Sequence, residues 1–241
     1  MTLSHERYLE AIEKESAALA EAARRNLGAR VPSCPDWSIQ DLVGHIGRVQ
    51  GFWGEMAERA FEDPSDTQNH SPPESVDVVE WFEESTRNLL SALDGSDLDR
   101  PMWSWSRVKT VSFVPRRMAQ ETAMHRWDAQ NAVGDPADIA GDLAVDGIDE
   151  LLFVFLPAGA PLEEPQGSSV HIHTTDSAGE WLAILEEEPV VTREHAKGDV
   201  ALRGPSSDVL LFLWGRIEPS SLEIHGDPAM LEQLRSVFDL E

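Results

Sequence analysis

The sequence predicts an α+β fold, in which a four-helix bundle is followed by a small α+β domain. Apolar residues recur with helical period through most of the first 140 of the 241 residues, and segments beyond about residue 160 alternate apolar with polar residues. The hydrophobic content of 41 % is typical of a soluble globular protein, and no run approaches the ~20 apolar residues of a membrane span. We expect residues 1–140 to form a metal-binding bundle and 141–241 to form the α+β domain.

The first two helices of the bundle are predicted by their apolar faces and by one capping signal. The first is expected over residues 4–26. The second is expected over about 39–60, because Ser38 and Asp41 have the spacing of a capping box, in which each satisfies a backbone N–H of the other.

The remaining helices of the first two-thirds follow polar or proline-containing segments. A third helix is expected over about 76–93, and Pro115 suits the first turn of a fourth that ends near Gly134. Four such helices joined by loops predict a bundle. One further helix, 142–155, leads into a linker rich in proline and glycine, "LPAGAPLEEPQGSS".

The predicted second domain mixes strands and helices. Strands are expected in "SVHIHTT", "EWLAILEEE", "DVALRG" and "SLEIHGD". Helices are expected in "SSDVLLFLWGR" and "PAMLEQLRSVF".

The charge balance is strongly acidic, with 44 Asp and Glu against 19 Lys and Arg and a formal net charge of -25. A field of that sign repels phosphate backbones and anionic lipid, so neither nucleic acid nor membrane is expected as a partner. The N-terminal segment lacks the apolar centre of a signal peptide. The single cysteine, Cys34, excludes an internal disulfide framework and suits a reducing compartment, so we expect a cytoplasmic protein.

The segment "QETAMHRWDAQ", residues 120–130, places charged groups on a face that should be buried. Glu121, His125 and Asp128 follow the helical period and continue a stripe of apolar or small residues. Buried charged groups are costly unless they are paired or bind a metal.

A second histidine lies on the apolar stripe of the predicted helix 39–60. His45 follows Asp41 by four residues, as His125 follows Glu121, but Asp41 already has a capping role. His45 could be a hydrogen-bonded core residue, and Glu121 with His125 an internal ion pair. Alternatively, one metal ion would satisfy all three side chains, because two imidazoles and a carboxylate are typical of catalytic zinc with an open fourth position.

Two other patterns allow both a structural and a ligand-binding interpretation. Gly44, Gly47, Gly51 and Gly54 recur on one helix face, which indicates close approach by a neighbouring helix or a ligand. His171 and His173, two apart on a predicted strand, could bind metal, although an outward-facing pair on an exposed strand is the simpler interpretation.

Four segments together resemble the mycothiol-dependent maleylpyruvate isomerase family: "VPSCPDWSIQDLVGHIGRVQGFW", "RRMAQETAMHRWDAQ", "LWGR" and "EIHGD". The resemblance covers nearly the whole chain. It implies a DinB-like four-helix metal-binding bundle and a C-terminal domain similar to sterol-carrier-protein folds. It also implies a divalent ion, usually zinc, held by residues that match His45, Glu121 and His125.

The same resemblance implies that an arginine of the C-terminal domain lies near the substrate. Arg216 is the candidate that would anchor a substrate carboxylate. Arg203 is a second candidate, which would lie near the cofactor. An ordinary cation at a helix C-terminus is the alternative for Arg216. Asp128 could orient His125 or pair with Arg126, and an ordinary surface ion pair is the alternative. The reactive thiol is expected to be mycothiol rather than Cys34, which lies between prolines at a helix entry.

The expected activity is therefore that of a zinc- and mycothiol-dependent isomerase or S-transferase acting on a small electrophile. A non-catalytic metal- or ligand-sensing protein and a metal-dependent hydrolase are the alternatives. The sequence leaves open the substrate, the native metal, the fate of the thiol and the oligomeric state.

Overall fold

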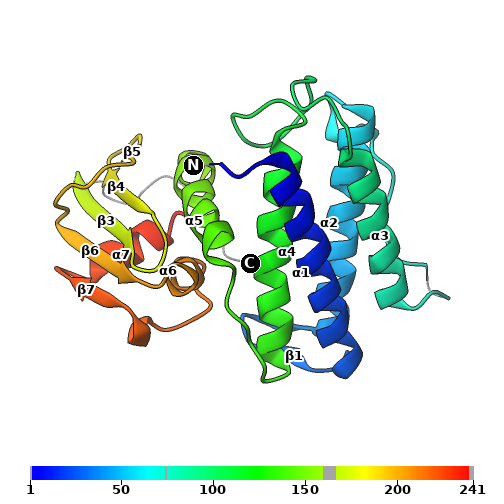
Figure 1. Cartoon of the computed structure of the whole chain (residues 1–241), viewed down its shortest axis with the longest axis horizontal. Coiled ribbons are helices and arrows are strands. Elements are labelled where there is room, and N and C mark those ends of the chain that lie inside the picture. The colour runs from blue at the N-terminus through cyan, green and yellow to red at the C-terminus, as the bar shows by residue number, and fades with distance from the viewer. Residues whose placement is uncertain (1, 74, 160–166, 239–241) are drawn as a thin grey trace. The chain divides into compact units, whose positions relative to one another are not determined.

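The structure, a computed structural model, describes residues 2–73, 75–159 and 167–238 (Figure 1). Its internal contacts separate two compact units, Leu3–Ala137 and a second that begins at Asp138. The predicted α+β class is confirmed, since the first unit is built on helices and the second contains the main sheet. The division into independent domains at residues 140 and 141 stays a prediction.

All four predicted helices of the first unit are present, with ends shifted by up to about two residues. They are α1 (His5–Arg25), α2 (Ile39–Arg59), α3 (Val78–Leu93) and α4 (Phe113–Ala132). They lie side by side in Figure 1, where α1 packs mainly on α4 and α2 on α3. A short 3-10 turn, Pro64–Asp66, lies in the loop between α2 and α3.

The start of α2 is fixed by the predicted capping box. The Ser38 hydroxyl accepts a hydrogen bond from the Asp41 amide, and the Asp41 carboxylate accepts one from the Ser38 amide. A small antiparallel ribbon that the sequence did not predict precedes this cap, formed by β1 (Arg30–Val31) and β2 (Cys34–Ser38). These strands have two and five residues, and the second contains a proline. Their alternation of apolar and polar residues is too short to be recognised from sequence.

Packing against α3 explains two of the glycines on this face of α2, Gly47 and Gly54. A Cβ on Gly47 would lie within 2.2 Å of the Trp81 ring of α3, and one on Gly54 within 3.3 Å of the Leu89 backbone. These contacts allow α2 and α3 to approach closely.

The first helix of the second unit is α5 (Gly141–Glu150). The predicted helix 142–155 is present over its whole range, but its type changes after α5, to a π-helix at Leu151–Phe155 and a 3-10 helix at Leu156–Ala158. Pro157 has no N–H to donate, so the α-helical hydrogen-bond pattern cannot continue through this residue. Residues 160–166 of the predicted linker lie outside the described residues.

The sheet of the second unit has the order β5-β4-β3-β6-β7, in which β3 and β6 are parallel and the other neighbours antiparallel. Its strands are β3 (Ser168–Thr174), β4 (Glu180–Leu185), β5 (Val190–Thr192), β6 (Val200–Gly204) and β7 (Glu223–His225). The edge strand β5 was not predicted, because three residues after a proline carry almost no alternation.

The sheet buries one face against helices. Val170, Ile172 and Trp181 point to this face and are at most 2 % exposed, and the Trp181 indole donates a hydrogen bond to Asp149 of α5. Helices α6 (Ser206–Leu213) and α7 (Ala229–Arg235) pack against β6 and β3, and a 3-10 turn, Pro219–Ser221, precedes β7. The alternate residues of β3 and β4 are half-buried on the opposite face.

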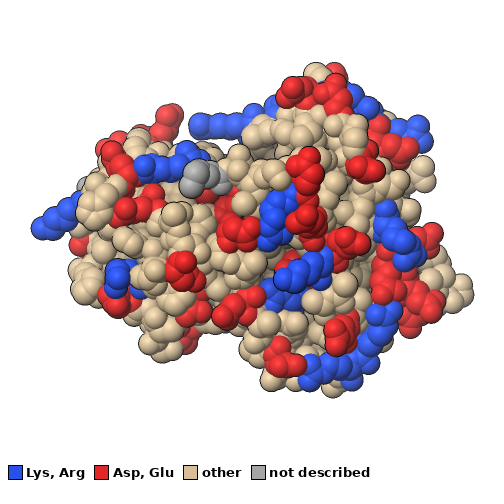
Figure 2. Space-filling model, viewed as in Figure 1, with Lys and Arg blue, Asp and Glu red and all other residues tan. Residues whose placement is uncertain are grey.

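The surface charge is mixed where it can be seen. On the face shown in Figure 2, acidic and basic side chains are interspersed. Among the described residues, no helix combines the length and apolar character needed to cross a bilayer.

Candidate metal centre

Three side chains from two helices converge inside the first unit. His45 extends from α2, and Glu121 and His125 extend from successive turns of α4. Glu121 Oε1 lies 3.3 Å from His45 Nε2 and 3.5 Å from His125 Nε2. Their ligand atoms all lie within 4.8 Å of one another. The structure thus brings together the three residues that the sequence singled out.

The local sequence explains this convergence in part. The spacing of four residues puts Glu121 and His125 on one face of α4, and α2 packs against α4 so that His45 faces them. Burial is graded, because the side chain of His125 is 8 % exposed while those of His45 and Glu121 are 28 % and 24 % exposed. The group is therefore accessible from the side of His45 and Glu121.

The inner nitrogen of His125 is held by Asp128. Asp128 Oδ2 lies 3.0 Å from His125 Nδ1, and the Ser33 hydroxyl donates to Asp128 Oδ1 over 2.6 Å. An ionised carboxylate only accepts hydrogen bonds, so Nδ1 carries the proton in this contact. This arrangement turns Nε2 toward Glu121 and matches the carboxylate–histidine–metal pattern of zinc sites.

Glu121 is oriented in a similar way by Arg117, one turn earlier on α4. Arg117 Nη2 contacts Glu121 Oε2 at 3.2 Å, which leaves Oε1 facing the two imidazoles. Sequence reasoning missed Arg117, although its spacing of four residues before Glu121 was a usable signal. It also missed Ser33, for which no local signal exists.

The Trp37 ring forms one wall of the group. Its centroid lies 4.9 Å from that of His45 and 6.4 Å from that of His125. Trp37 is the residue immediately before the Ser38 cap, so the start of α2 places an aromatic ring beside the histidine carried by its second turn.

The electrostatics of the group favour a cation. Burial acts to raise the pKa of Glu121, but hydrogen bonds from His125 and His45 and the charges of His125 and Arg117 outweigh it and hold that pKa well below its usual range. Burial acts to lower the pKa of His125, whereas its hydrogen bonds to Asp128 and Glu121 and their charges raise it to about 9. The carboxylates therefore stabilise positive charge here, and the donor set of two imidazoles and one carboxylate fits a divalent transition metal.

The two predicted arginines lie in the second unit. Arg216 follows α6, and its guanidinium donates to the carbonyl of Trp214 over 2.8 Å. Arg203 on β6 has both oxygens of Glu223 on β7 within 2.9 Å, which is a cross-strand ion pair on the surface.

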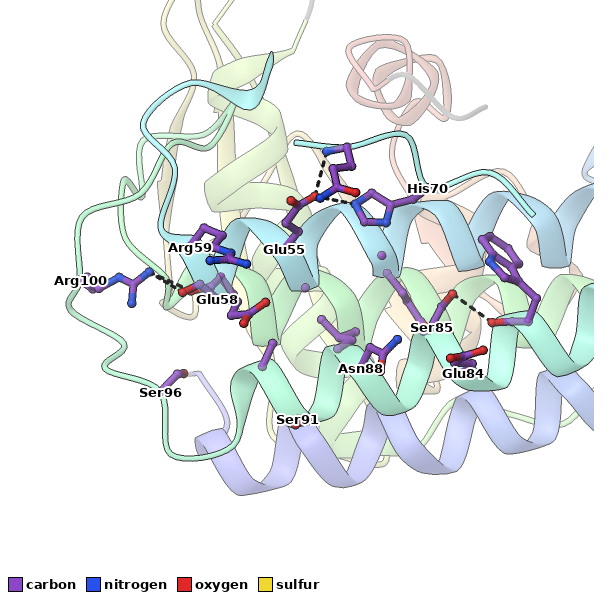
Figure 3. Close-up of a pocket in the computed structure, with 18 of the residues that line it drawn as sticks. Glu55, Glu58, Arg59, His70, Glu84, Ser85, Asn88, Ser91, Ser96 and Arg100 are labelled. Atoms are coloured by element: carbon purple, nitrogen blue, oxygen red, sulfur yellow. Dashed lines mark hydrogen bonds and ion pairs between the residues drawn. The ribbon is translucent and has the colours of Figure 1, made fainter. Parts of the chain in front are cut away.

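A hollow of about 760 Å³ lies elsewhere in the first unit, lined mainly by α2 and α3 (Figure 3). His70 points to Glu55 at one edge of this hollow, with Nε2 and Oε2 2.9 Å apart. None of the three converging residues is part of its lining. Its location therefore gives no support to a ligand at the converging group.

Comparison with known proteins gives two consistent results. Residues 9–130 match the mycothiol maleylpyruvate isomerase N-terminal domain, and residues 142–233 match the C-terminal domain of the same family. No curated protein sequence matches the chain.

Two solved structures share the fold: a mycothiol-dependent maleylpyruvate isomerase and a histidine-to-alanine mutant of such an enzyme. In each case the TM-score is 0.63 at 12 % sequence identity, and the match covers 93 % of this chain and 95 % of the other. The resemblance inferred from the motifs is confirmed by the two domain matches: the chain belongs to the mycothiol maleylpyruvate isomerase family.

Proposed function

We propose that this protein is a zinc-dependent enzyme that activates the thiol of mycothiol for addition to a small electrophile. Cis–trans isomerisation of maleylpyruvate is the first reaction to test, because both domains match the family named for it. The observation that carries the proposal is the convergence of His45, Glu121 and His125 on a common point.

A divalent ion held by these side chains would supply the positive charge that stabilises a thiolate over a thiol. Three protein ligands leave one coordination position of a four-coordinate ion for a ligand from solution. The partial exposure of His45 and Glu121 provides the approach for that ligand.

The surrounding residues hold the three ligands in place. Asp128 keeps the proton of His125 on Nδ1 and so leaves Nε2 to act as a ligand, while Ser33 holds Asp128. Arg117 holds the far oxygen of Glu121. The Trp37 ring limits the space beside His45.

The sulfur is proposed to come from the cofactor rather than from the protein. Cys34 is 9 % exposed and lies in β2, where it serves the packing of the ribbon. A buried thiol in such a position is a poor nucleophile.

Mycothiol would supply the thiolate. In isomerisation its sulfur would bond to one carbon of the cis double bond, and the π electrons would pass to the conjugated carbonyl. After rotation about the resulting carbon–carbon single bond, that electron pair would return and the carbon–sulfur bond would break, which would release the thiolate and give the trans isomer. In S-transfer by addition the carbon–sulfur bond would be kept, and the resulting enolate would take up a proton.

Arg216 is our candidate for the anchor of a substrate carboxylate, because guanidinium binds carboxylate with two parallel hydrogen bonds. Arg203, which already has Glu223 as a partner, is the second candidate, near the cofactor. Arg216→Lys should raise KM for a carboxylate substrate more than it lowers kcat if the anchor role is right.

The central experiment measures divalent metal by elemental analysis and turnover of maleylpyruvate with and without mycothiol. Wild type and His45→Ala are compared with His70→Ala, which removes a histidine of the same unit outside the group. We expect His45→Ala to lose activity together with one equivalent of metal relative to wild type, and His70→Ala to keep both. Full metal content and activity in His45→Ala would overturn the proposal.

The same assay separates the alternatives. Stoichiometric metal without turnover across a panel of electrophiles would indicate a metal- or ligand-sensing protein. Activity without added thiol would indicate a hydrolase.

A further inference from the structure

The half-buried face of the sheet carries a second cluster of metal-type side chains. His171 and His173 lie two apart on β3 and therefore point to the same face. Glu180 is directly opposite His173 in the antiparallel pairing of β3 and β4. His195 comes from the connection between β5 and β6. The four residues belong to three separate segments of the second unit.

The three imidazoles all approach one carboxylate oxygen. Glu180 Oε1 lies 2.8 Å from His171 Nε2, 3.2 Å from His173 Nδ1 and 2.5 Å from His195 Nδ1. The two oxygens of a carboxylate offer about four lone-pair sites in total, or about two each, so three imidazoles on one oxygen are a crowded arrangement. The cluster gathers four groups, each able to bind a metal, around one point.

A metal ion would bind all four side chains at once. In a tetrahedral zinc site with bonds of about 2.0–2.1 Å, neighbouring ligand atoms lie about 3.4 Å apart. The ligand atoms of this cluster all lie within 4.8 Å of one another, so binding would draw the most distant pair together by at most about 1.4 Å. Three imidazoles and one carboxylate complete the four ligands of such a site.

We propose that His171, His173, Glu180 and His195 bind a divalent transition-metal ion of the zinc type, at a site distinct from the bundle centre. With four protein ligands the site is structural, because no coordination position is left for a substrate. The bound ion ties the β5–β6 connection to the face of the sheet.

Side-chain contacts anchor both ends of the β5–β6 connection to the rest of the second unit. Arg193 forms a two-pronged ion pair with the buried Asp149, with contacts of 2.5 and 2.9 Å. Asp199 accepts hydrogen bonds from the amide and hydroxyl of Ser169. His195 lies between these anchors, and its side chain, although 81 % exposed, turns back to Glu180.

The test is made in the full-length His45→Ala protein, in which the bundle centre is disabled. Zinc binding is measured by competition with a chromophoric chelator and by elemental analysis after equilibrium dialysis. Three proteins are compared: His45→Ala alone, the same protein with His195→Ala, and the same protein with His225→Ala. His195 and His225 are both exposed, so neither change should affect folding, and His225 lies outside the cluster.

We expect about one equivalent of zinc in His45→Ala and in its His225→Ala derivative. The His195→Ala derivative should bind at least about tenfold more weakly, since loss of even an outer partner of a metal ligand costs 10–100-fold. Absence of zinc from His45→Ala, or equal affinity with and without His195, would overturn the proposal.

Proteolysis tests whether the bound metal ties the β5–β6 connection to the sheet. Lys197 is exposed and lies two residues beyond His195, within the connection. Zinc should slow tryptic cleavage after Lys197 in His45→Ala and should not slow it in the His195→Ala derivative. Equal cleavage rates with and without zinc in His45→Ala would contradict the tying of this connection.

Discussion

Replacing Asp128 with asparagine should weaken metal binding at the bundle centre while leaving the bundle folded. The change keeps the size of the side chain and removes its negative charge. An asparagine oxygen can still accept the hydrogen bond from His125 Nδ1, and its amide can donate to Ser33, so the packing is preserved. What is lost is the charge that makes His125 a better ligand.

The expected size follows from the position of Asp128. Loss of an outer carboxylate partner of a metal-bound histidine costs about 10–100-fold in metal affinity. Asp128 is 0 % exposed and lies 3.0 Å from His125 Nδ1, so water cannot replace the missing charge. We therefore expect the upper half of that range, about 30–100-fold, which corresponds to about 2–2.8 kcal/mol.

The assay is a zinc competition titration at neutral pH, with the melting temperature measured in parallel. Asp135→Asn is the matched control, because Asp135 follows α4 and pairs with Arg25 on the surface at 2.8 Å. Ser33→Ala should weaken zinc binding in the same direction as Asp128→Asn and by less, because the charge remains. Equal zinc affinity in Asp128→Asn and Asp135→Asn would refute the orienting role of Asp128.

Two further predictions concern α2, which carries His45 at its second turn. Gly47→Ala should be less stable than Gly44→Ala by about 1–3 kcal/mol in urea unfolding. Both changes gain the same helix propensity, but only the Cβ added at residue 47 overlaps the Trp81 ring. Equal stability of the two variants would contradict the packing explanation. Hydrogen bonds from the hydroxyl and amide of Ser38 lower the pKa of Asp41 in the folded protein below its usual 3.8. The capping interaction therefore stabilises the fold fully at pH values above 3.8, and this stabilisation is lost as the pH falls through the lowered pKa of the folded protein. Asp41→Asn should therefore be less stable than wild type at pH values above about 4, and the difference should narrow on acidification; a difference independent of pH would count against this cause.

Much of the first unit could be predicted because its signals are local. The helical period of apolar residues and the capping box of α2 depend on residues at most a few positions apart, and the observed helix ends agree closely. The weak elements were missed for the same reason. The ribbon β1–β2 and the edge strand β5 are held by pairing with distant segments, and their own sequences carry little alternation.

The candidate metal centre in the bundle and the histidine cluster on the sheet could each be predicted only in part from local sequence patterns. The shared face of Glu121 and His125 follows from helical spacing, and that of His171 and His173 from strand alternation. Their partners come from elsewhere, since His45 is 76 residues from Glu121 and His195 is 15 residues from Glu180. No periodicity links such positions.

The sequence by itself determined the order of the bundle helices and of four of the five strands of the main sheet, the faces that the candidate ligands occupy, and family membership through motifs spread along the chain. Tertiary structure alone decided that Ser33 and Asp128 meet behind His125 and that three imidazoles gather around Glu180. The physical reason is range: hydrogen bonding and side-chain direction within one element repeat every few residues, whereas the approach of two elements depends on how their buried faces pack together.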